Sequence, residues 1–358
     1  MTTPGTKVSE TELLADPHYY LFDTLPEQGS SRFLVTNERE LAEATFTDIR
    51  YESKATDSVS VSTQELVSMF GANPVERPDM GFIFHHAFVC STLVARSLNT
   101  LQAFIALKEP WILRRLADIK RQHAGTIPAD HWKIMMSTYV DLLAKQYKSG
   151  DSVIVKATNV ANNLLYDVFY FWPERPVLYM HSDIEAFLVT NLKKNAETQK
   201  KMPGLLADFL KDVDLRAQLA DLKMPPTRSL LHTCALIWVA NIHTLKVAAE
   251  KYSADRLRCL DMKTLLAQPD AVMTTVSNHF GHEPGEHDRL RMTSKEIMGR
   301  NAKDKRQRYD SETKSREDRQ VLTAHRDEID AVVEWITPLV EELDLYDFLR
   351  ARQIAPHN

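Results

Sequence analysis

The stretch Gly81-Phe-Ile-Phe-His-His-Ala-Phe-Val-Cys-Ser-Thr-Leu-Val-Ala-Arg-Ser-Leu98 decides the fold. It begins with an apolar run at 82–84, long enough for a buried strand, and ends in a helical pattern at 93–98. Between them, Cys90, Ser91 and Thr92 supply small residues and two hydroxyls where the helix should begin. A strand, a tight turn and a helix in this order direct backbone N–H groups and the helix dipole at one point. The stretch therefore predicts an anion site, of the kind that most often holds phosphate or sulfate.

The same stretch lacks the literal phosphate-loop motif, Gly-x4-Gly-Lys-[Ser/Thr]. When Thr92 takes the last position, Ser91 stands at the lysine position, and Cys90 and His85 stand at the two glycine positions. An ordinary strand–helix unit, with a Ser or Thr cap on its helix, also explains the stretch. The rest of the chain has to decide between these two interpretations.

The composition is that of a large, nearly neutral chain. Its 358 residues can bury the core of one large α/β domain or of two smaller ones. The net charge of −5, from 44 basic and 49 acidic residues, gives no reason to expect a nucleic-acid partner. Three isolated cysteines argue against a disulfide framework and for a reducing compartment. The N-terminus has no apolar leader and no segment reaches the ~18 apolar residues of a membrane span, so we expect a soluble cytoplasmic protein.

Three further apolar runs end in polar side chains and are followed by helical patterns. The runs and the polar residues that follow them are 104–107 with Lys108 and Glu109, 153–155 with Lys156, and 176–180 with His181 and Ser182. This alternation is typical of βαβ units and predicts a parallel sheet flanked by helices. Right-handed crossovers place all four polar strand ends at one edge, where open α/β sheets bind ligands. The coincidence favours a functional site, although a solvated Lys-Glu turn at 108–109 is an alternative.

The remaining segments are expected to surround this sheet. Residues 1–78 are predicted to be an N-terminal extension or lid, packed on a core domain that spans 79–358. The segment 202–252 is helical throughout and is predicted to be an insertion, with a central packed helix at 227–252. A last strand is expected near 257–260. Basic residues crowd 300–308, which indicates either a solvated loop or a loop that folds over an anion.

In this order, the landmarks resemble the sulfotransferase superfamily, over about residues 80–345. The chain looks most similar to uncharacterised bacterial sulfotransferase-family proteins. The resemblance implies a three-layer P-loop NTPase-like α/β fold and the donor 3′-phosphoadenosine 5′-phosphosulfate (PAPS), with no metal. It also implies transfer of a sulfuryl group to a hydroxyl or amine of a small-molecule acceptor. The Met, Trp and Tyr content of residues 1–75 and 202–252 suggests a partly apolar pocket for this acceptor, although helix packing uses the same residue types.

The resemblance assigns roles to particular residues. The 5′-phosphosulfate loop falls on 84–93, and its expected binding residues are Phe88, Val89, Cys90, Ser91, Thr92 and Leu93. Glu109 falls where carbohydrate sulfotransferases often carry their general base, and His85 and His86 are rival bases. Lys156 lies in the run 155–158, which resembles the family's Glu-Lys-Thr-Pro strand end. The segment 260–269 resembles its Tyr-Glu-Asp-Leu-x3-Pro stretch.

Two departures from the family pattern matter. The loop lysine or arginine that contacts the transferring group aligns with Phe88, so Lys156 or Lys108 would have to provide that cation. The Arg-x7-Ser pair that holds the 3′-phosphate aligns with Ser182 and Thr190, which leaves the hydroxyl and removes the arginine. The candidate replacements for this arginine are His181, Lys193 and the basic loop with Arg300, Lys303 and Lys305.

Two other classes of function stay open at this point. A P-loop kinase using ATP is the first, and the missing loop lysine counts against it. A non-catalytic nucleotide-binding protein of the same fold is the second, and Phe88 favours it. Neither the identity of the acceptor nor the oligomeric state can be predicted from the sequence.

Overall fold

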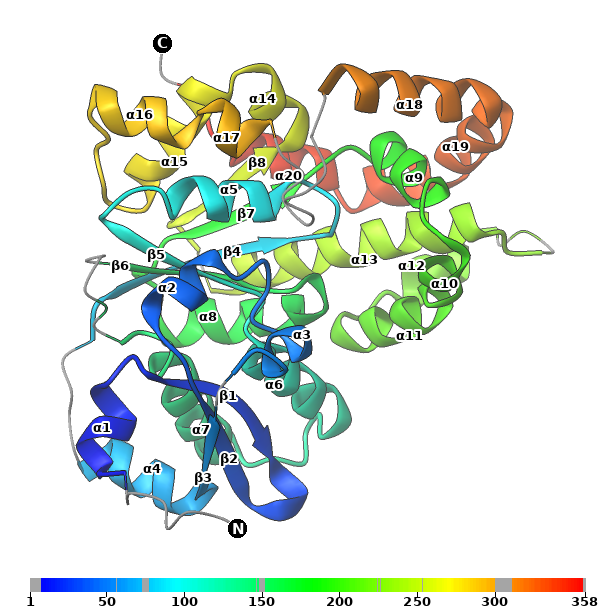
Figure 1. The fold of residues 1–358 in the computed structure, drawn as a ribbon. Helices are drawn as coiled ribbons and strands as arrows, with labels where there is room; N and C mark the ends of the chain where they lie inside the picture. Colours follow the sequence, from blue (N-terminus) through cyan, green and yellow to red (C-terminus); the bar gives the residue numbers. More distant parts are fainter. Residues whose placement is uncertain are drawn as a thin grey trace.

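The centre of the fold is a five-stranded parallel sheet (Figure 1). The computed structural model describes residues 8–55, 57–72, 77–145, 147, 152–223, 225, 227–252, 254–299 and 311–356. The strands are β4 (Asp79–His85), β5 (Phe104–Lys108), β6 (Ser152–Lys156), β7 (Val177–His181) and β8 (Leu257–Asp261), in the spatial order β5-β6-β4-β7-β8. Every neighbouring pair is parallel, so all five carboxyl ends lie at one edge. The predicted strands and their common edge are confirmed.

Helices cover both faces of this sheet, which gives three layers. Strand side chains alternate between the faces: Ile83 packs in one apolar core with Val94, whereas Phe82 and Phe84 pack in the other. The first face carries α5 (Ser91–Leu98), α14 (Met262–Ala267), α15 (Pro269–His279), α16 (Glu286–Met292) and α17 (Lys295–Met298). The second face carries α6 (Trp111–Gln122), η2 (Asn159–Leu164), α8 (Leu165–Phe171) and α13 (Leu230–Lys251). The α/β class predicted from the alternation is therefore correct.

The N-terminal part forms a separate, antiparallel sheet below the central one (Figure 1). Its strands are β1 (Tyr19–Leu25), β2 (Ser30–Val35) and β3 (Asp57–Ser62), and its helices are α1 (Glu10–Ala15), η1 (Pro26–Gln28), α2 (Glu38–Glu43), α3 (Ile49–Glu52) and α4 (Thr63–Ala72). It shares the larger apolar core, and the Tyr139 hydroxyl of α7 (Ala129–Asp141) bonds to those of Thr24 and Ser31 at 2.8 and 2.7 Å. The division of the chain at residue 78 stays a prediction.

A mainly helical block stands at the other end of the molecule (Figure 1). It contains α9 (Ile184–Leu192), α10 (Ala196–Lys200), α11 (Met202–Asp212), α12 (Arg216–Asp221), α18 (Ser311–Ala324), α19 (Arg326–Glu342) and α20 (Leu345–Ala351). Of these, α9, α11, α19 and α20 pack against α13. Among the described helices, α13 alone is long and apolar enough to cross a membrane, and 72% of its apolar window is buried inside the protein. It is thus the central packed helix that the sequence predicts.

Candidate active site

The loop between β4 and α5 has an unusual backbone for a segment without glycine. Ala87, Phe88 and Cys90 have left-handed φ angles of 83°, 60° and 62°, a region that residues other than glycine seldom adopt. Helix α5 begins at Ser91, and the first N–H groups of a helix have no acceptor within it. Left-handed residues next to a helix N-terminus aim successive N–H groups at one point, which forms an anion-binding concavity. The loop therefore has the form that the sequence predicts.

His85 fixes the first turn of this loop. The Ala87 N–H donates to His85 Nδ1 at 2.9 Å, so the proton of the neutral ring lies on Nε2, which donates to the Ala157 carbonyl at 3.1 Å. The ring thus links the end of β4 to the residue that follows β6. With both ring nitrogens engaged in this way, His85 is suited to shaping the loop and poorly suited to accepting a substrate proton.

His86 is buried behind the loop. The Ser182 N–H donates to His86 Nε2 at 2.8 Å, and the ring lies against Phe187, with 4.9 Å between ring centroids. Burial, and to a smaller extent the nearby His181, lower the pKa of His86 to about 3. The imidazole is therefore neutral at physiological pH, and its Nε2 already accepts a hydrogen bond. These contacts favour a structural role over the general base that the sequence analysis considered.

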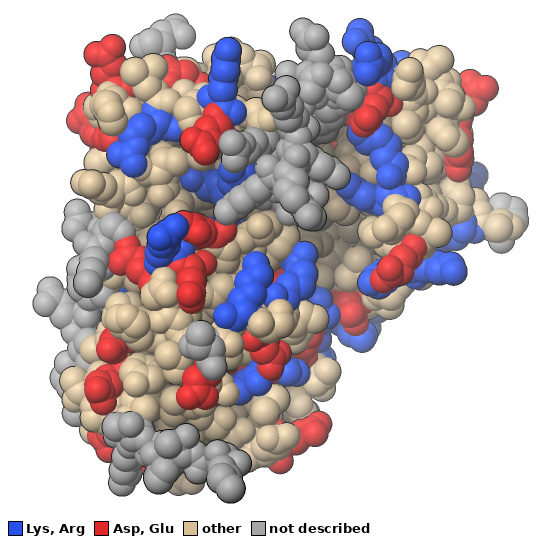
Figure 2. All heavy atoms as spheres, in the orientation of Figure 1, with Lys and Arg blue, Asp and Glu red and all other residues tan. Residues whose placement is uncertain are grey.

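The loop opens into a cavity of about 440 Å³. The residues 85–93, Glu109 and Lys156 line it on the sheet side, Phe46 and Arg50 line it from the N-terminal part, and α9 to α11 and α13 complete the wall. The cations among its described lining residues are Arg50, Lys156, Lys193, Lys194 and Lys201, against the single carboxylate of Glu109. Figure 2 shows Lys and Arg on both flanks of the hollow between the regions of α3 and α9. The cavity is therefore electrostatically suited to a polyanion.

Glu109 and Lys156 form an ion pair at the wall of the cavity. The Lys156 side chain is 1% exposed and that of Glu109 is 16% exposed. Glu109 follows β5 with a left-handed φ of 58°, and its N–H donates to the Lys156 carbonyl at 2.7 Å. This backbone turn brings the carboxylate of one strand end to the ammonium of the next. A half-buried carboxylate at the wall of a cavity can accept a proton from a substrate.

The N-terminal part contributes an aromatic ring and a guanidinium beside this pair. The Phe46 ring has the Arg50 guanidinium 4.0 Å and the Lys156 ammonium 5.7 Å from its centroid. The Thr47 N–H donates to the Lys108 carbonyl at 2.7 Å, which ties this segment to the end of β5. Nothing in the motifs near residue 50 indicates this contribution, so the sequence analysis missed both Phe46 and Arg50.

Lys108 and Ser182 do not line the cavity. The Lys108 ammonium is fully buried and donates to the carbonyls of Ala42 and Ala106 at 2.9 and 3.0 Å, so it holds the sheet and is not available as a catalytic cation. The Ser182 hydroxyl donates to the Asp183 carbonyl at 3.1 Å, away from the cavity lining. We therefore withdraw Lys108 and Ser182 as site residues.

The other predicted residues divide into three groups. The loop residues Phe88, Val89, Cys90, Ser91, Thr92 and Leu93 all line the cavity, as do Thr190 and Lys193. His181 instead lies near Asp261 and Gln353, at the far side of the sheet edge. Arg300, Lys303 and Lys305 fall outside the residues that the structure describes.

The positive charges on the helical side come from the end of α9 and from α10. Lys193 and Lys194 follow α9, and Lys201 follows α10. Lys193 also forms an ion pair with Asp318 of α18 and lies 3.8 Å from Glu317. The sequence analysis names Lys193 from this wall, but not Lys194 or Lys201. A sequence signal was present, because two adjacent lysines follow an apolar helix.

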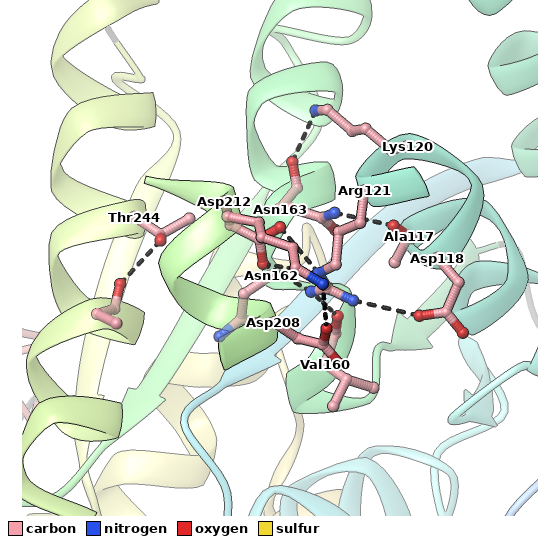
Figure 3. A network of polar contacts seen from close by, with 12 residues as sticks. Ala117, Asp118, Lys120, Arg121, Val160, Asn162, Asn163, Asp208, Asp212 and Thr244 are labelled. Carbon is pink, nitrogen blue, oxygen red and sulfur yellow. Dashed lines mark hydrogen bonds and ion pairs between the residues drawn. The ribbon is translucent and has the colours of Figure 1, made fainter. Parts of the chain in front are cut away.

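A buried polar network supports η2, the turn that follows the Lys156 strand. The Asn162 amide donates to the His85 carbonyl at 3.1 Å and to Asn241 Oδ1 at 2.6 Å. Close by, Arg121 makes a bidentate pair with Asp212 and also donates to the Val160 carbonyl (Figure 3). Because the network joins β4, α6, η2 and α13, it fixes the position of the loop from behind.

Comparisons with known proteins give structural neighbours but no sequence relatives. No model of a protein family matches the chain, and no curated protein matches it in sequence. A solved sulfotransferase domain from the curacin biosynthetic pathway aligns with a TM-score of 0.42 and 10% identity, covering 70% of this chain and 98% of that domain. The sulfotransferase domain of the Synechococcus PCC 7002 olefin synthase aligns with a TM-score of 0.36 and 11% identity, covering 71% of this chain and 97% of that domain. These two structural neighbours are sulfotransferase domains, the family that the sequence resembles.

Proposed function

We propose that the chain is a sulfotransferase that moves a sulfuryl group from PAPS to a hydroxyl or amine of a small-molecule acceptor. One observation carries the proposal: an anion-binding loop at the start of α5 and the Glu109–Lys156 pair line the same cavity. The loop suits the charge that develops on a leaving phosphate, and the carboxylate suits removal of a proton from an acceptor. Group transfer of this kind asks the protein mainly for positioning and charge stabilisation.

The lining residues fit the donor at both of its anionic ends. The N–H groups of residues 89–93 and the hydroxyls of Ser91 and Thr92 would hold the 5′-phosphosulfate. Thr190 and Lys193, on the α9 wall, would hold the 3′-phosphate in place of the missing arginine. When bound, PAPS supplies an activated sulfuryl group attached to a phosphate that leaves readily. Four of the five lining cations also pair with carboxylates, namely Arg50, Lys156, Lys193 and Lys201. Cations still outnumber carboxylates among the described lining residues, which supports a polyanionic ligand.

Glu109 would accept the acceptor's proton. Lys156 forms an ion pair with this carboxylate at the wall of the cavity, where only 16% of the Glu109 side chain is exposed. The apolar side chains on the opposite wall, Phe187, Met202, Leu205 and Ile237, limit water around the reacting group. Excluding water strengthens each charge interaction in the site.

A non-catalytic nucleotide-binding protein is the second candidate, and Phe88 favours it. This phenylalanine stands in the loop where the resembling family carries a cation. A protein of this kind would bind the nucleotide through the same loop and the same lysines. It would differ in showing no transfer to any acceptor.

Calorimetry with two nucleotides tests the proposal. We expect 3′-phosphoadenosine 5′-phosphate (PAP) to bind more tightly than ATP with Mg²⁺, and Thr92→Val to weaken PAP about tenfold, since a bond to a charged group contributes ~1.5 kcal/mol. Thr274→Val, an exposed threonine of α15, is the matched control and should leave PAP affinity unchanged. Tighter binding of ATP with Mg²⁺ would contradict the proposal and favour a kinase. Tight PAP binding without transfer from PAPS to a panel of phenols, alcohols and amines would favour the non-catalytic alternative.

A further inference from the structure

Lys194 and Phe88 are in contact across the mouth of the anion loop. The Lys194 ammonium lies 4.1 Å from the centroid of the Phe88 ring, and both residues line the cavity. Phe88 sits within the turn itself, with its φ at 60°. A lysine at this distance over an aromatic face gains a cation–π interaction. The positive charge of Lys194 therefore lies next to position 88 of the loop.

The backbone around Lys194 is held on both sides. The Gln199 amide donates to the carbonyls of Asn191 and Leu192 at 3.1 and 3.2 Å, which closes the end of α9. Asn195 caps α10 by accepting from the Thr198 N–H at 2.9 Å. Lys194 lies between these two fixed points, so its side chain leaves the backbone from a defined position.

Lys193 and Lys194 point their ammonium groups to different partners. Lys193 is paired with Asp318 of α18, whereas Lys194 lies on Phe88 of the loop. Of the two neighbours, Lys194 is thus the one whose charge stands against the loop.

We propose that Lys194 is the cation that contacts the transferred sulfuryl group and that the Phe88 ring is the platform that positions it. This inference rests on the proposed sulfotransferase function. In the transfer, Glu109 takes the acceptor's proton while the acceptor oxygen forms the new S–O bond. The old S–O bond to the 5′-phosphate breaks with its electron pair left on the phosphate, and Lys194 balances the charge on the sulfuryl oxygens. Phe88 is then compatible with catalysis, because it positions Lys194, from the end of α9, where the family has a cation in the loop.

The affinities of PAP and PAPS, measured by calorimetry without an acceptor, test this assignment. The two ligands differ only by the sulfuryl group, so a contact to that group affects PAPS alone. In Lys194→Met, which keeps the length of the side chain, PAPS should bind about tenfold more weakly, while PAP should change by less than about threefold. Lys194→Arg should restore most of the PAPS affinity. Lys200→Met, an exposed lysine of α10 outside the cavity lining, is the control and should change neither.

The platform role of Phe88 is tested in the same assay. Phe88→Leu should weaken PAPS nearly as much as Lys194→Met, and adding Phe88→Leu to Lys194→Met should cost little more, because the two residues act as one unit. Equal losses of PAP and PAPS in Lys194→Met, or additive losses in the double variant, would overturn the inference while the proposed function stands. An unmodified protein that binds neither nucleotide would overturn both.

Discussion

Replacing Lys156 by methionine should destabilise the protein because it leaves the Glu109 carboxylate without its cation. Removing one partner of a buried ion pair costs ~3–5 kcal/mol, since the other charge remains in a poorly solvated place. The Lys156 side chain is 1% exposed and the Glu109 side chain 16%, so some water reaches the abandoned carboxylate. The variant also loses the ammonium 5.7 Å from the Phe46 ring, which contributes ~0.5 kcal/mol. We therefore expect a loss near the lower limit, about 3 kcal/mol in the free energy of unfolding.

Urea unfolding at pH 7.5 measures this loss. Lys211→Met, which removes an exposed lysine 3.0 Å from Asp208, is the control and should cost less than ~0.5 kcal/mol. Adding Glu109→Gln to Lys156→Met should recover part of the stability, because neither charge is then left alone. A loss below ~1 kcal/mol, or a double variant less stable than Lys156→Met, would refute the reasoning.

Three further predictions concern the base, the buried histidine and the network behind the loop. Glu109→Gln should retain PAP affinity in calorimetry and lose ~10²-fold or more in turnover, the usual contribution of a positioned base; unchanged turnover removes Glu109 from that role. The pKa of His86 is about 3 in the folded protein against its usual 6.5, so His86 takes up a proton at higher pH in the unfolded chain than in the folded one. The free energy of unfolding should therefore fall as the pH drops below 6.5. At pH 4.5, His86 should account for ~2–3 kcal/mol of the loss in the free energy of unfolding. In urea unfolding, His86→Gln should show a correspondingly weaker dependence of stability on pH; an unchanged dependence would contradict this. Asn162→Leu should cost ~2 kcal/mol by stranding the His85 carbonyl and Asn241 Oδ1, and it should speed amide hydrogen exchange in residues 85–93; unchanged exchange would show that the network does not hold the loop.

The strands of the central sheet could be predicted because each is a short apolar run, buried on both faces and followed by a helical pattern. The third N-terminal strand, β3, could not, because its sequence Asp-Ser-Val-Ser-Val-Ser is mostly polar and exposed. Only its pairing with β2 identifies it as a strand. Helix α7 ends at Asp141 although buried side chains continue to Lys145, because the residues after Asp141 form a turn that is buried without being helical.

The candidate site was predictable where its residues are consecutive in the chain. Ser91 and Thr92 follow from the strand–turn–helix pattern, and Glu109 and Lys156 follow from strand ends. The pattern could not separate Glu109 from its neighbour Lys108, because a left-handed backbone angle at Glu109 decides which of them faces the cavity. Arg50 and Lys194 come from elements that carry no motif. Their place is set by tertiary contacts, such as the hydrogen bond from Thr47 to the end of β5.

The absence of glycine from residues 86–92 has a consequence for how binding is balanced against folding. Glycine would adopt the left-handed angles of Ala87, Phe88 and Cys90 at no steric cost, but it would leave the loop flexible and lose more conformational entropy on ordering. In this chain, the left-handed angles reduce the stability of the folded protein by ~1 kcal/mol for each of the three residues. The loop is thus ordered before any ligand binds, so little conformational entropy is lost on binding and little is regained on dissociation. Replacing Cys90 by glycine would move this cost from folding to binding, so the chain would be more stable and would bind the anion that we propose for this loop more weakly.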